Sequence, residues 1–248
     1  MKFIGIIPSR FASTRFPGKP MADICGKTVI RRVYEQAVKA LDTVVVATDD
    51  DRIYDAVESF GGKVVMTRAD HKCGTDRCLE AYEAITTPAW RAQNDGETVI
   101  INIQGDEPFI QPEQIETLME CFKKEDTDIA TLVRPFTDKD TQEELEDVNT
   151  PKVNWDTTTG EAKMFSRKVI TASDGKHYRH IGIYAYRADV LAKITQLPQS
   201  PLEIAERLEQ LRWLENGYTI RVGVTRIPTI GIDTPEDLEK AINWYRRS

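Results

Sequence analysis

The chain opens on Lys2-Phe3-Ile4-Gly5-Ile6-Ile7-Pro8, a brief apolar run rich in isoleucine. Such a run is too short for a helix and is typical of a buried strand. Similar runs rich in valine and isoleucine recur at residues 43–48, 63–67 and 98–103. We interpret these runs as parallel strands of one sheet.

Amphipathic segments separate and follow these strands. Apolar residues recur in them at three- and four-residue spacing, as in helices that lie on a sheet. The segments are 29–41, 52–60, 75–85 and 114–122. A strand over 128–133 extends the alternation to about residue 134. The alternation predicts an α/β fold with a doubly wound, Rossmann-like, mostly parallel sheet.

The pattern changes beyond residue 134. Short strand-like runs separated by turn clusters predict antiparallel hairpins. The runs are 152–155, 162–165 and 177–186. We therefore expect an inserted antiparallel subdomain at about residues 135–200, suited to dimerisation, within a single domain that spans residues 1–248.

Two capping motifs predict helices near the end of the chain. Ser200-Pro201-Leu202-Glu203 combines a capping box with proline at the first helical position, and Gly217 follows. We therefore expect one helix over 201–216. After a strand over 219–224, Thr234-Pro235-Glu236-Asp237 starts a closing helix to about residue 245.

The composition excludes several classes of protein. With 248 residues, 40% hydrophobic and 29% charged, the chain is an ordinary globular protein. Its net charge of −7 argues against nucleic-acid binding, so an anionic ligand needs a local basic site. No apolar run approaches the roughly 20 residues of a membrane-spanning helix, and no signal or transit pattern opens the chain. We expect a cytoplasmic protein whose four cysteines are reduced thiols.

The loop over residues 8–20 is strongly basic. It holds Arg10, Arg15 and Lys19, and no acidic residue occurs before Asp23. Because ligands bind at the carboxyl ends of strands in doubly wound sheets, these cations are placed to hold phosphate oxygens. We expect a triphosphate here; the alternative is a solvated surface loop. The polar and small residues that favour the first interpretation are Ser13, Thr14 and Gly18.

Two familiar nucleotide-binding motifs are absent. Gly26-Lys27-Thr28 resembles the end of a P-loop, but Met21 stands where the first glycine is required. We interpret this segment as a turn and a helix start. No G-x-G-x-x-G follows a strand, which removes the main support for a nicotinamide dehydrogenase.

Two aspartates are candidate metal ligands. Asp106 lies in Gln104-Gly105-Asp106-Glu107-Pro108, at the end of the fourth strand, where a carboxylate can hold Mg²⁺ against phosphates. Asp233 precedes the cap of the last helix. Each aspartate alone is explained as a turn residue, so the hypothesis depends on the pair.

The basic loop and the Gln-Gly-Asp-Glu-Pro segment together resemble the 3-deoxy-manno-octulosonate (KDO) cytidylyltransferases, over nearly the whole chain. That family opens on a P-A-R-Y-x-S-T-R-L-P-G-K-P-L loop, from which this chain departs at Ser9, Phe11, Phe16 and Met21. Another departure is Cys73, where the family commonly has serine. Further agreement lies in residues 67–71, 74–77, 165–167, 179–184 and 200–211.

The resemblance implies an activity and its residues. CTP and KDO would give CMP-KDO and pyrophosphate, activating KDO for lipopolysaccharide biosynthesis, with Mg²⁺ as cofactor and a homodimer as the assembly. The implied catalytic residues are Arg10, Lys19, Asp106 and Asp233, of which Asp106 and Asp233 would hold the metal. The implied nucleotide ligands are Pro8, Arg10, Ser13, Thr14, Arg15, Lys19, Cys73, Gly74, Thr75, Arg77 and Gln104. The implied sugar ligands are Gln104, Arg167, His180, Tyr184, Glu206, Glu209 and Gln210.

Some of the implied sugar ligands also have a plainer explanation. The apolar stripe expected on a helix over 201–216 consists of Ile204, Leu208, Leu211 and Leu214. Glu206 and Gln210 then lie on the side that normally meets solvent, and they are functional only if that side faces a cleft. His177 and His180 point to opposite faces of a strand, which argues against a zinc pair and leaves His180 as a hydroxyl partner.

Two other functions stay open. A cytidylyltransferase for another acidic sugar, such as a sialic acid, would keep the basic loop and change the pocket over 165–210. A non-catalytic nucleotide-binding module on the same fold would not need both Asp106 and Asp233, and both are present.

Overall fold

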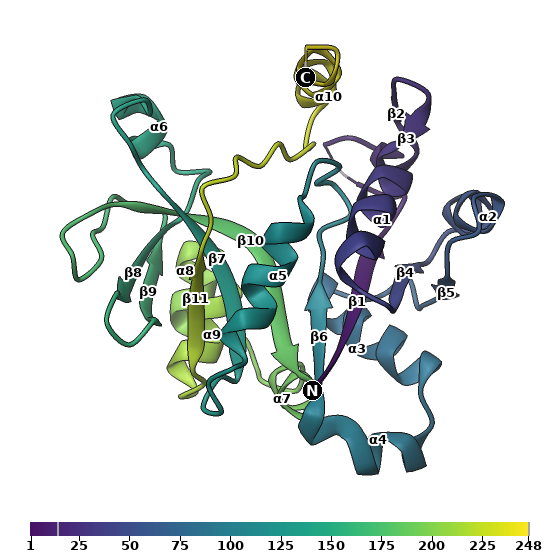
Figure 1. Ribbon diagram of the computed structural model, residues 1–248, viewed down its shortest axis with the longest axis horizontal. Coiled ribbons are helices and arrows are strands. Elements are labelled where there is room, and N and C mark those ends of the chain that lie inside the picture. Colours follow the sequence, from purple (N-terminus) through teal and green to yellow (C-terminus); the bar gives the residue numbers. More distant parts are fainter. Residues whose placement is uncertain (14, 248) are drawn as a thin grey trace. The chain divides into compact units, whose positions relative to one another are not determined.

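The computed structural model describes residues 1–13 and 15–247. The chain forms two compact units (Figure 1). Unit 1 consists of Met1–Ile115 together with Thr229–Ser248, and unit 2 is Glu116–Pro228. Each unit contains a sheet with helices packed against it, so the chain has an α/β fold with parallel and antiparallel strands.

Unit 1 is built on a parallel sheet in the order β5-β4-β1-β6. These strands are β1 (Lys2–Ser9), β4 (Val44–Thr48), β5 (Val64–Met66) and β6 (Thr98–Asn102). They coincide with the four predicted apolar runs, which confirms that prediction. Every residue of β4 and β6 is buried, as expected for strands covered on both faces.

Helices follow these strands as the sequence predicted. They are α1 (Val29–Ala40), α2 (Asp51–Ser59), α3 (Gly74–Ile85) and the unpredicted α4 (Pro88–Asn94), which η2 (Asp95–Glu97) follows. The side chains of Thr28, Asp50 and Cys73 cap the first three by accepting from backbone N–H groups. Two further helices are α5 (Pro112–Cys121), which crosses the division between the units, and α10 (Pro235–Tyr245).

A short hairpin precedes α1. It pairs β2 (Asp23–Ile24) with β3 (Lys27–Thr28) through Cys25 and Gly26, both of which have positive φ. The segment that resembled a P-loop is therefore a turn and a helix start, as we interpreted it. Ile24 and Val29 pack with Ile232 and Ala241 in one buried cluster, so the end of the chain is fixed in unit 1.

Unit 2 contains a mixed sheet in the order β10-β7-β11-β9-β8. Its strands are β7 (Ile129–Pro135), β8 (Lys152–Asp156), β9 (Glu161–Ser166), β10 (Tyr178–Arg187) and β11 (Ile220–Val224). The β8–β9 hairpin and the β7–β10 pair are antiparallel, whereas β11 is parallel to β7. The antiparallel strands that we expected within about 135–200 thus lie in this unit. The unit itself, Glu116–Pro228, extends beyond the expected range at both ends.

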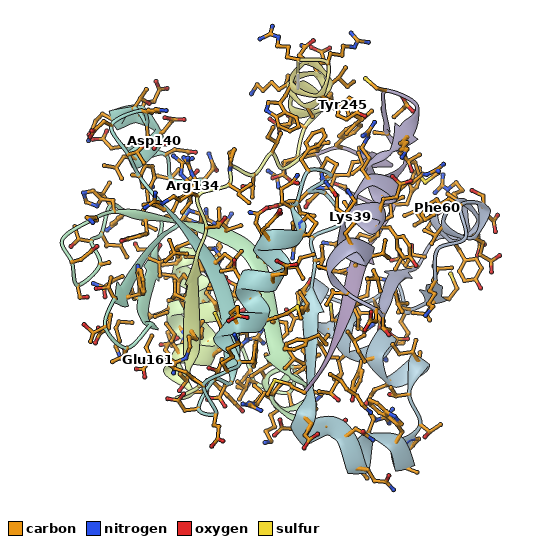
Figure 2. All side chains as sticks on the ribbon, in the orientation of Figure 1. Lys39, Phe60, Arg134, Asp140, Glu161 and Tyr245 are labelled. Atoms are coloured by element: carbon orange, nitrogen blue, oxygen red, sulfur yellow. The ribbon has the colours of Figure 1, made fainter. Side chains whose placement is uncertain are left out.

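Ion pairs hold the loop that follows β7. Asp140 accepts hydrogen bonds from the guanidinium groups of Arg134 and Arg179, and the Arg179 bond is 2.6 Å long. Figure 2 labels Arg134 and Asp140 beside the loop that leads to α6 (Gln142–Glu146). These two arginines therefore have a structural function in unit 2.

The single helix predicted over 201–216 is wrong. The segment forms α8 (Pro201–Glu206) and α9 (Gln210–Glu215), because Arg207 adopts a left-handed backbone with φ +55° that ends the first helix. The predicted stripe is broken as well: Ile204 is 61% exposed, whereas Glu203 is buried and pairs with Arg212. The short α7 (Ala188–Ile194), like α6, was not predicted.

Two expectations from composition can be compared with the structure. In the described part of the chain, every helix is too short or too polar to cross a membrane. Among the described residues, the four cysteines form no disulfide, as predicted for reduced thiols.

Candidate active site

Lys19 is positioned by a tight turn in the basic loop. Gly18 has a left-handed backbone with φ +73° and precedes the short helix η1 (Lys19–Met21). A Cβ atom at Gly18 would lie 2.9 Å from the ring of Phe11. Both the backbone and this contact therefore require glycine, which fixes where the Lys19 side chain leaves the loop.

The loops that carry the two aspartates are joined by their backbones. The N–H of Ile232 donates to the carbonyl oxygen of Asp106 at 2.9 Å, which brings Asp233 beside the end of β6. A Cβ atom at Gly105 would lie 2.9 Å from the carbonyl oxygen of Pro8. Glycine therefore permits the loop after β6 to approach the end of β1.

Two aspartates and two cations converge at this point. The Lys19 Nζ atom lies 2.6 Å from Asp106 Oδ2 and 3.2 Å from Asp233 Oδ1, and the Arg15 Nη2 atom forms an ion pair with the same Asp233 oxygen at 3.0 Å. Lys19 and Asp106 are largely buried, whereas Arg15 is mostly exposed. The structure thus brings the cationic loop to two aspartates that lie 87 and 214 positions after Lys19 in the sequence.

A polar cavity of about 390 Å³ surrounds this cluster. It lies at the carboxyl ends of β1 and β6, where an α/β sheet binds its ligands. Most of the predicted nucleotide and catalytic residues line it: Pro8, Arg10, Ser13, Arg15, Lys19, Gly74, Gln104, Asp106 and Asp233.

The remaining predicted nucleotide ligands lie near α3, with one exception. Cys73 and Arg77 line an adjoining cavity of about 40 Å³, which shares Pro8 and Gly74 with the larger one. Thr75 is buried in the first turn of α3. Thr14 lies outside the described residues.

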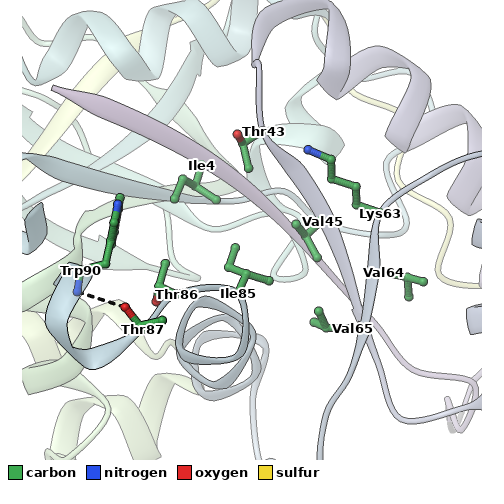
Figure 3. A pocket seen from close by; sticks show the side chains of 10 residues that line it. All are labelled: Ile4, Thr43, Val45, Lys63, Val64, Val65, Ile85, Thr86, Thr87 and Trp90. Atoms are coloured by element: carbon green, nitrogen blue, oxygen red, sulfur yellow. Dashed lines mark hydrogen bonds between the residues drawn. The ribbon is translucent and has the colours of Figure 1, made fainter.

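A third cavity in unit 1, of about 510 Å³, is chemically different (Figure 3). Its walls are mainly apolar, and Lys63 is the charged residue among the described ones that line it. Trp90 forms one wall, and its backbone N–H donates to the Thr87 hydroxyl at 3.2 Å. Without carboxylates or a group of cations, this cavity is not a candidate for phosphate chemistry.

In unit 2, His180 and Tyr184 on β10 lie in an aromatic cluster. The rings of Phe165 and Tyr184 lie 5.2 and 5.4 Å from the imidazole, and its Nε2 is 2.9 Å from the Thr131 hydroxyl. Burial lowers the pKa of His180 to about 3, so the imidazole is neutral. Burial, followed by the nearby Glu209 charge, raises the pKa of Tyr184. These side chains offer neutral hydrogen-bonding groups.

The other predicted sugar ligands lie around α8 and α9. Gln210 is only 4% exposed, so the solvent-facing explanation fails for it, and its Nε2 has no hydrogen-bond partner among the described residues. Glu209 pairs with Arg212 at 2.9 Å. Arg167 donates to backbone carbonyl oxygens of Val148, Glu206 and Arg207, and its N–H donates to the Glu206 carboxylate at 3.1 Å. In this structure Arg167 therefore caps the end of α8.

Known proteins are similar to this sequence over nearly its whole length. The cytidylyltransferase family matches residues 4–222. The 3-deoxy-manno-octulosonate cytidylyltransferase of Parabacteroides distasonis is 58% identical over 253 residues, which cover 98% of this chain and 97% of the relative. The chain belongs to the 3-deoxy-manno-octulosonate cytidylyltransferase family. The member from Bacteroides thetaiotaomicron is 55% identical, with 99% of both chains covered.

A solved structure agrees with this family. It is a CMP:2-keto-3-deoxy-manno-octonic acid synthetase complexed with CTP, 39% identical in sequence, with a TM-score of 0.88. The match covers 100% of this chain and 99% of that one. The fold of the two units is therefore that of this cytidylyltransferase family.

The aspartate pair of this cytidylyltransferase fits a divalent cation. In proteins, Mg²⁺ is usually held by one or two carboxylates, with phosphate and water oxygens as the other ligands. Asp106 and Asp233 already share one cationic neighbour, Lys19. Among the described residues, no cluster of three or more His, Cys, Asp or Glu is arranged for a metal. The pair therefore matches a metal site in which phosphate oxygens of a bound nucleotide would supply further ligands.

Glu107 belongs to the same site, and the sequence analysis missed it. Its carboxyl oxygen Oε2 is buried and has no hydrogen-bond partner among the described residues. Burial, and then the charges of Asp106 and Asp233, raise its pKa to about 7. The available signal was a second acidic residue directly after a buried strand, but the pattern does not tell which of two adjacent acids turns inward.

Proposed function

We propose that this protein transfers CMP from CTP to the anomeric hydroxyl of KDO, giving CMP-KDO and pyrophosphate. The observation that carries the proposal is the convergence of Lys19 with Asp106 and Asp233 in the 390 Å³ cavity. Similarity to KDO cytidylyltransferases over the full chain supports the same acceptor sugar.

The cations of the cavity would stabilise the charge that develops in this reaction. When the sugar oxygen attacks the α-phosphorus in line, negative charge spreads over the phosphate oxygens and the leaving pyrophosphate. Arg10, Arg15 and Lys19 line the cavity and can donate to those oxygens. Lys19, now shared by two carboxylates, would turn one of its three donors to phosphate.

Mg²⁺ is the proposed cofactor, held by Asp106 and Asp233 with phosphate oxygens. A bound ion would neutralise phosphate charge and lower the pKa of the attacking hydroxyl. The protein's part is to present the two carboxylates from loops that the Ile232–Asp106 hydrogen bond holds together. Glu107 would add a third carboxyl group beside this pair.

Three of the proposed sugar ligands in unit 2 suit the hydroxyl groups of KDO, whereas its carboxylate requires a cation, for which we propose Arg167. His180 is neutral, and Tyr184 and Gln210 offer buried polar groups. Such a site holds a sugar mainly through neutral hydrogen bonds and penalises a wrong hydroxyl pattern. Gln104, in the wall of the nucleotide cavity, is a further proposed sugar ligand.

We also propose the wider setting of the enzyme. Its strand–helix alternation supports a Rossmann-like core of the nucleotide-diphospho-sugar transferase type. The family resemblance supports a cytoplasmic homodimer whose product enters lipopolysaccharide biosynthesis. Size-exclusion chromatography with light scattering tests the assembly directly.

Pyrophosphate release tests the reaction. The purified protein is mixed with CTP and either KDO or a sialic acid, with Mg²⁺ or with EDTA. We expect rapid release with KDO and Mg²⁺ only. Release with the sialic acid but not with KDO would assign the second acceptor, and release that is insensitive to EDTA would refute the metal's role. Absence of turnover together with tight CTP binding would favour the non-catalytic alternative.

A further inference from the structure

The mainly apolar cavity of unit 1 is separate from the proposed reaction site. It measures about 510 Å³ and includes Ile4 and Val45, near the amino ends of β1 and β4. Pro8, which lines the nucleotide cavity, lies about 13 Å from Ile4 along β1. The two cavities therefore lie toward opposite ends of the same strands, and the proposed reaction leaves this one unused.

Helix α4 forms one side of this cavity without burying any of its own residues. Trp90 lines the cavity from this helix. Polar contacts hold the helix in place: the Lys2 ammonium lies 4.9 Å from the centre of the Trp90 ring and donates to Asn94 at 2.8 Å. The Arg91 guanidinium donates to carbonyl oxygens at the end of α3, at 3.1 and 3.2 Å. The cavity is thus preformed, because contacts that do not fill it fix its walls.

The walls suit the apolar part of a small molecule. Val65 and Ile85 line the cavity and are only partly buried, so each keeps accessible apolar surface. A molecule that covered this surface would gain hydrophobic free energy. The cavity volume also lies within the range of roughly 300 to 1,000 Å³ that is usual for small-molecule sites. The cavity therefore has the size and the lining of a ligand site.

Lys63 gives the cavity one cationic group. Its ammonium makes no hydrogen bond or ion pair with a described residue, and the Thr43 hydroxyl is likewise unpaired among residues 1–13 and 15–247. In Figure 3 the Lys63 side chain extends toward Thr43, whereas Trp90 stands on the other side of the view. The hydroxyls of Thr86 and Thr87 are already bonded to backbone groups. An occupant would therefore meet a cation and a hydroxyl donor at one end of an apolar space.

We propose that this cavity binds an amphipathic monocarboxylate. Its apolar body would pack against Val65, Ile85 and Trp90, and its carboxylate would accept hydrogen bonds from the Lys63 ammonium and the Thr43 hydroxyl. One cation matches a single negative charge, whereas a triphosphate would need several. This site goes beyond the proposed function and does not depend on it, because no nucleotide or sugar enters this cavity.

Calorimetric titration with octanoate, in the absence of nucleotide and sugar, tests the proposal. We expect saturable binding of one octanoate per chain. The uncharged 1-octanol should bind about threefold to fivefold more weakly, since it lacks the ion pair with Lys63, and octylamine should bind more weakly still. Equal affinities for the three compounds, or no binding of octanoate, would overturn the proposal.

Lys63→Met tests the cation, because it keeps the length of the side chain and removes its charge. Octanoate should then bind about threefold to fivefold more weakly, at the level of 1-octanol, while the affinity for 1-octanol stays unchanged. Lys39→Met is the matched control: Lys39 is exposed on α1 and does not line the cavity, so this variant should bind octanoate like the wild type. An unchanged affinity of Lys63→Met for octanoate would refute the role of Lys63.

Val65→Phe tests the location, because the larger side chain takes up space inside the cavity. Octanoate binding should fall by at least about tenfold, with the thermal unfolding midpoint kept. Undiminished binding would place octanoate elsewhere and overturn the proposal. Light scattering of the same variants separates a different occupant: if Val65→Phe or Lys63→Met changes the oligomeric state, a second copy of the chain covers this cavity and the proposal is refuted.

Discussion

We expect the wild-type protein to lose stability as pH rises, because the buried Glu107 carboxyl ionises. Replacing Glu107 by glutamine should remove this loss. Glu107 has a buried carboxyl oxygen without a partner and lies beside the charges of Asp106 and Asp233. Its pKa in the folded protein is about 7, against 4.5 for an ordinary glutamate. Glutamine keeps the shape and carries no charge at any pH, so it isolates the ionisation of this one group.

The sign and the size follow from proton binding. Between pH 4.5 and 7 the unfolded chain loses the Glu107 proton while the folded protein keeps it. The folded state therefore binds more protons, and the free energy of unfolding falls as pH rises through this window and levels off above pH 7. Since one pKa unit corresponds to about 1.4 kcal/mol, the loss amounts to at most roughly 3 kcal/mol.

Urea unfolding in EDTA from pH 5 to pH 8.5 measures this effect, with circular dichroism as the signal. At pH 5 the Glu107→Gln variant and the wild type should be nearly equal, whereas at pH 8 the variant should be more stable by up to about 3 kcal/mol. Glu116→Gln, an exposed change on α5, is the control and should follow the wild type. Parallel stability curves for wild type and Glu107→Gln would show that the carboxyl ionises as freely in the folded protein as in water.

Three further predictions concern the proposed reaction. Asp106→Asn keeps the fold but should reduce turnover at least about a hundredfold, because a neutral amide holds a divalent cation poorly; near-normal pyrophosphate release would exclude the metal role. Lys19→Ala should raise the KM for CTP about tenfold or more through the loss of a charge-assisted donor, and unchanged CTP kinetics would place the triphosphate elsewhere. His180 should remain neutral in ¹⁵N spectra at pH 5, since burial lowers its pKa to about 3; a protonated ring at that pH would contradict its buried position.

The sheet of unit 1 could be predicted because its signals are local. Runs such as the one that forms β4 are short, apolar and β-branched, and the helix after each run shows its own period. The break at Arg207 could not be predicted, because a left-handed backbone at a non-glycine residue leaves no mark in the pattern of apolar residues. The same break turns Gln210 inward, which the assumption of one continuous helix had placed toward solvent.

The candidate site, like the fold, could be predicted only in part. Lys19 and Asp106 follow strands whose carboxyl ends share an edge, so their proximity follows from the topology. Asp233 comes from the far end of the chain; its place before a helix cap made it a candidate, but no local pattern predicts that it lies beside Asp106.

The charges of the nucleotide cavity explain how one site can be stable both without and with its substrate. Without nucleotide, Lys19 and Arg15 pair with Asp106 and Asp233, so both carboxylates have a cationic partner in this largely polar cavity. A magnesium nucleotide carries both signs: in the proposed complex, its cation would take the carboxylates and its phosphates would take Lys19 and Arg15. The cation alone would take the carboxylates and leave Lys19 and Arg15 without partners. The phosphates alone would take Lys19 and Arg15 and leave the carboxylates without partners. The proposed metal and the triphosphate should therefore strengthen each other's binding, as two ligands of one linked equilibrium.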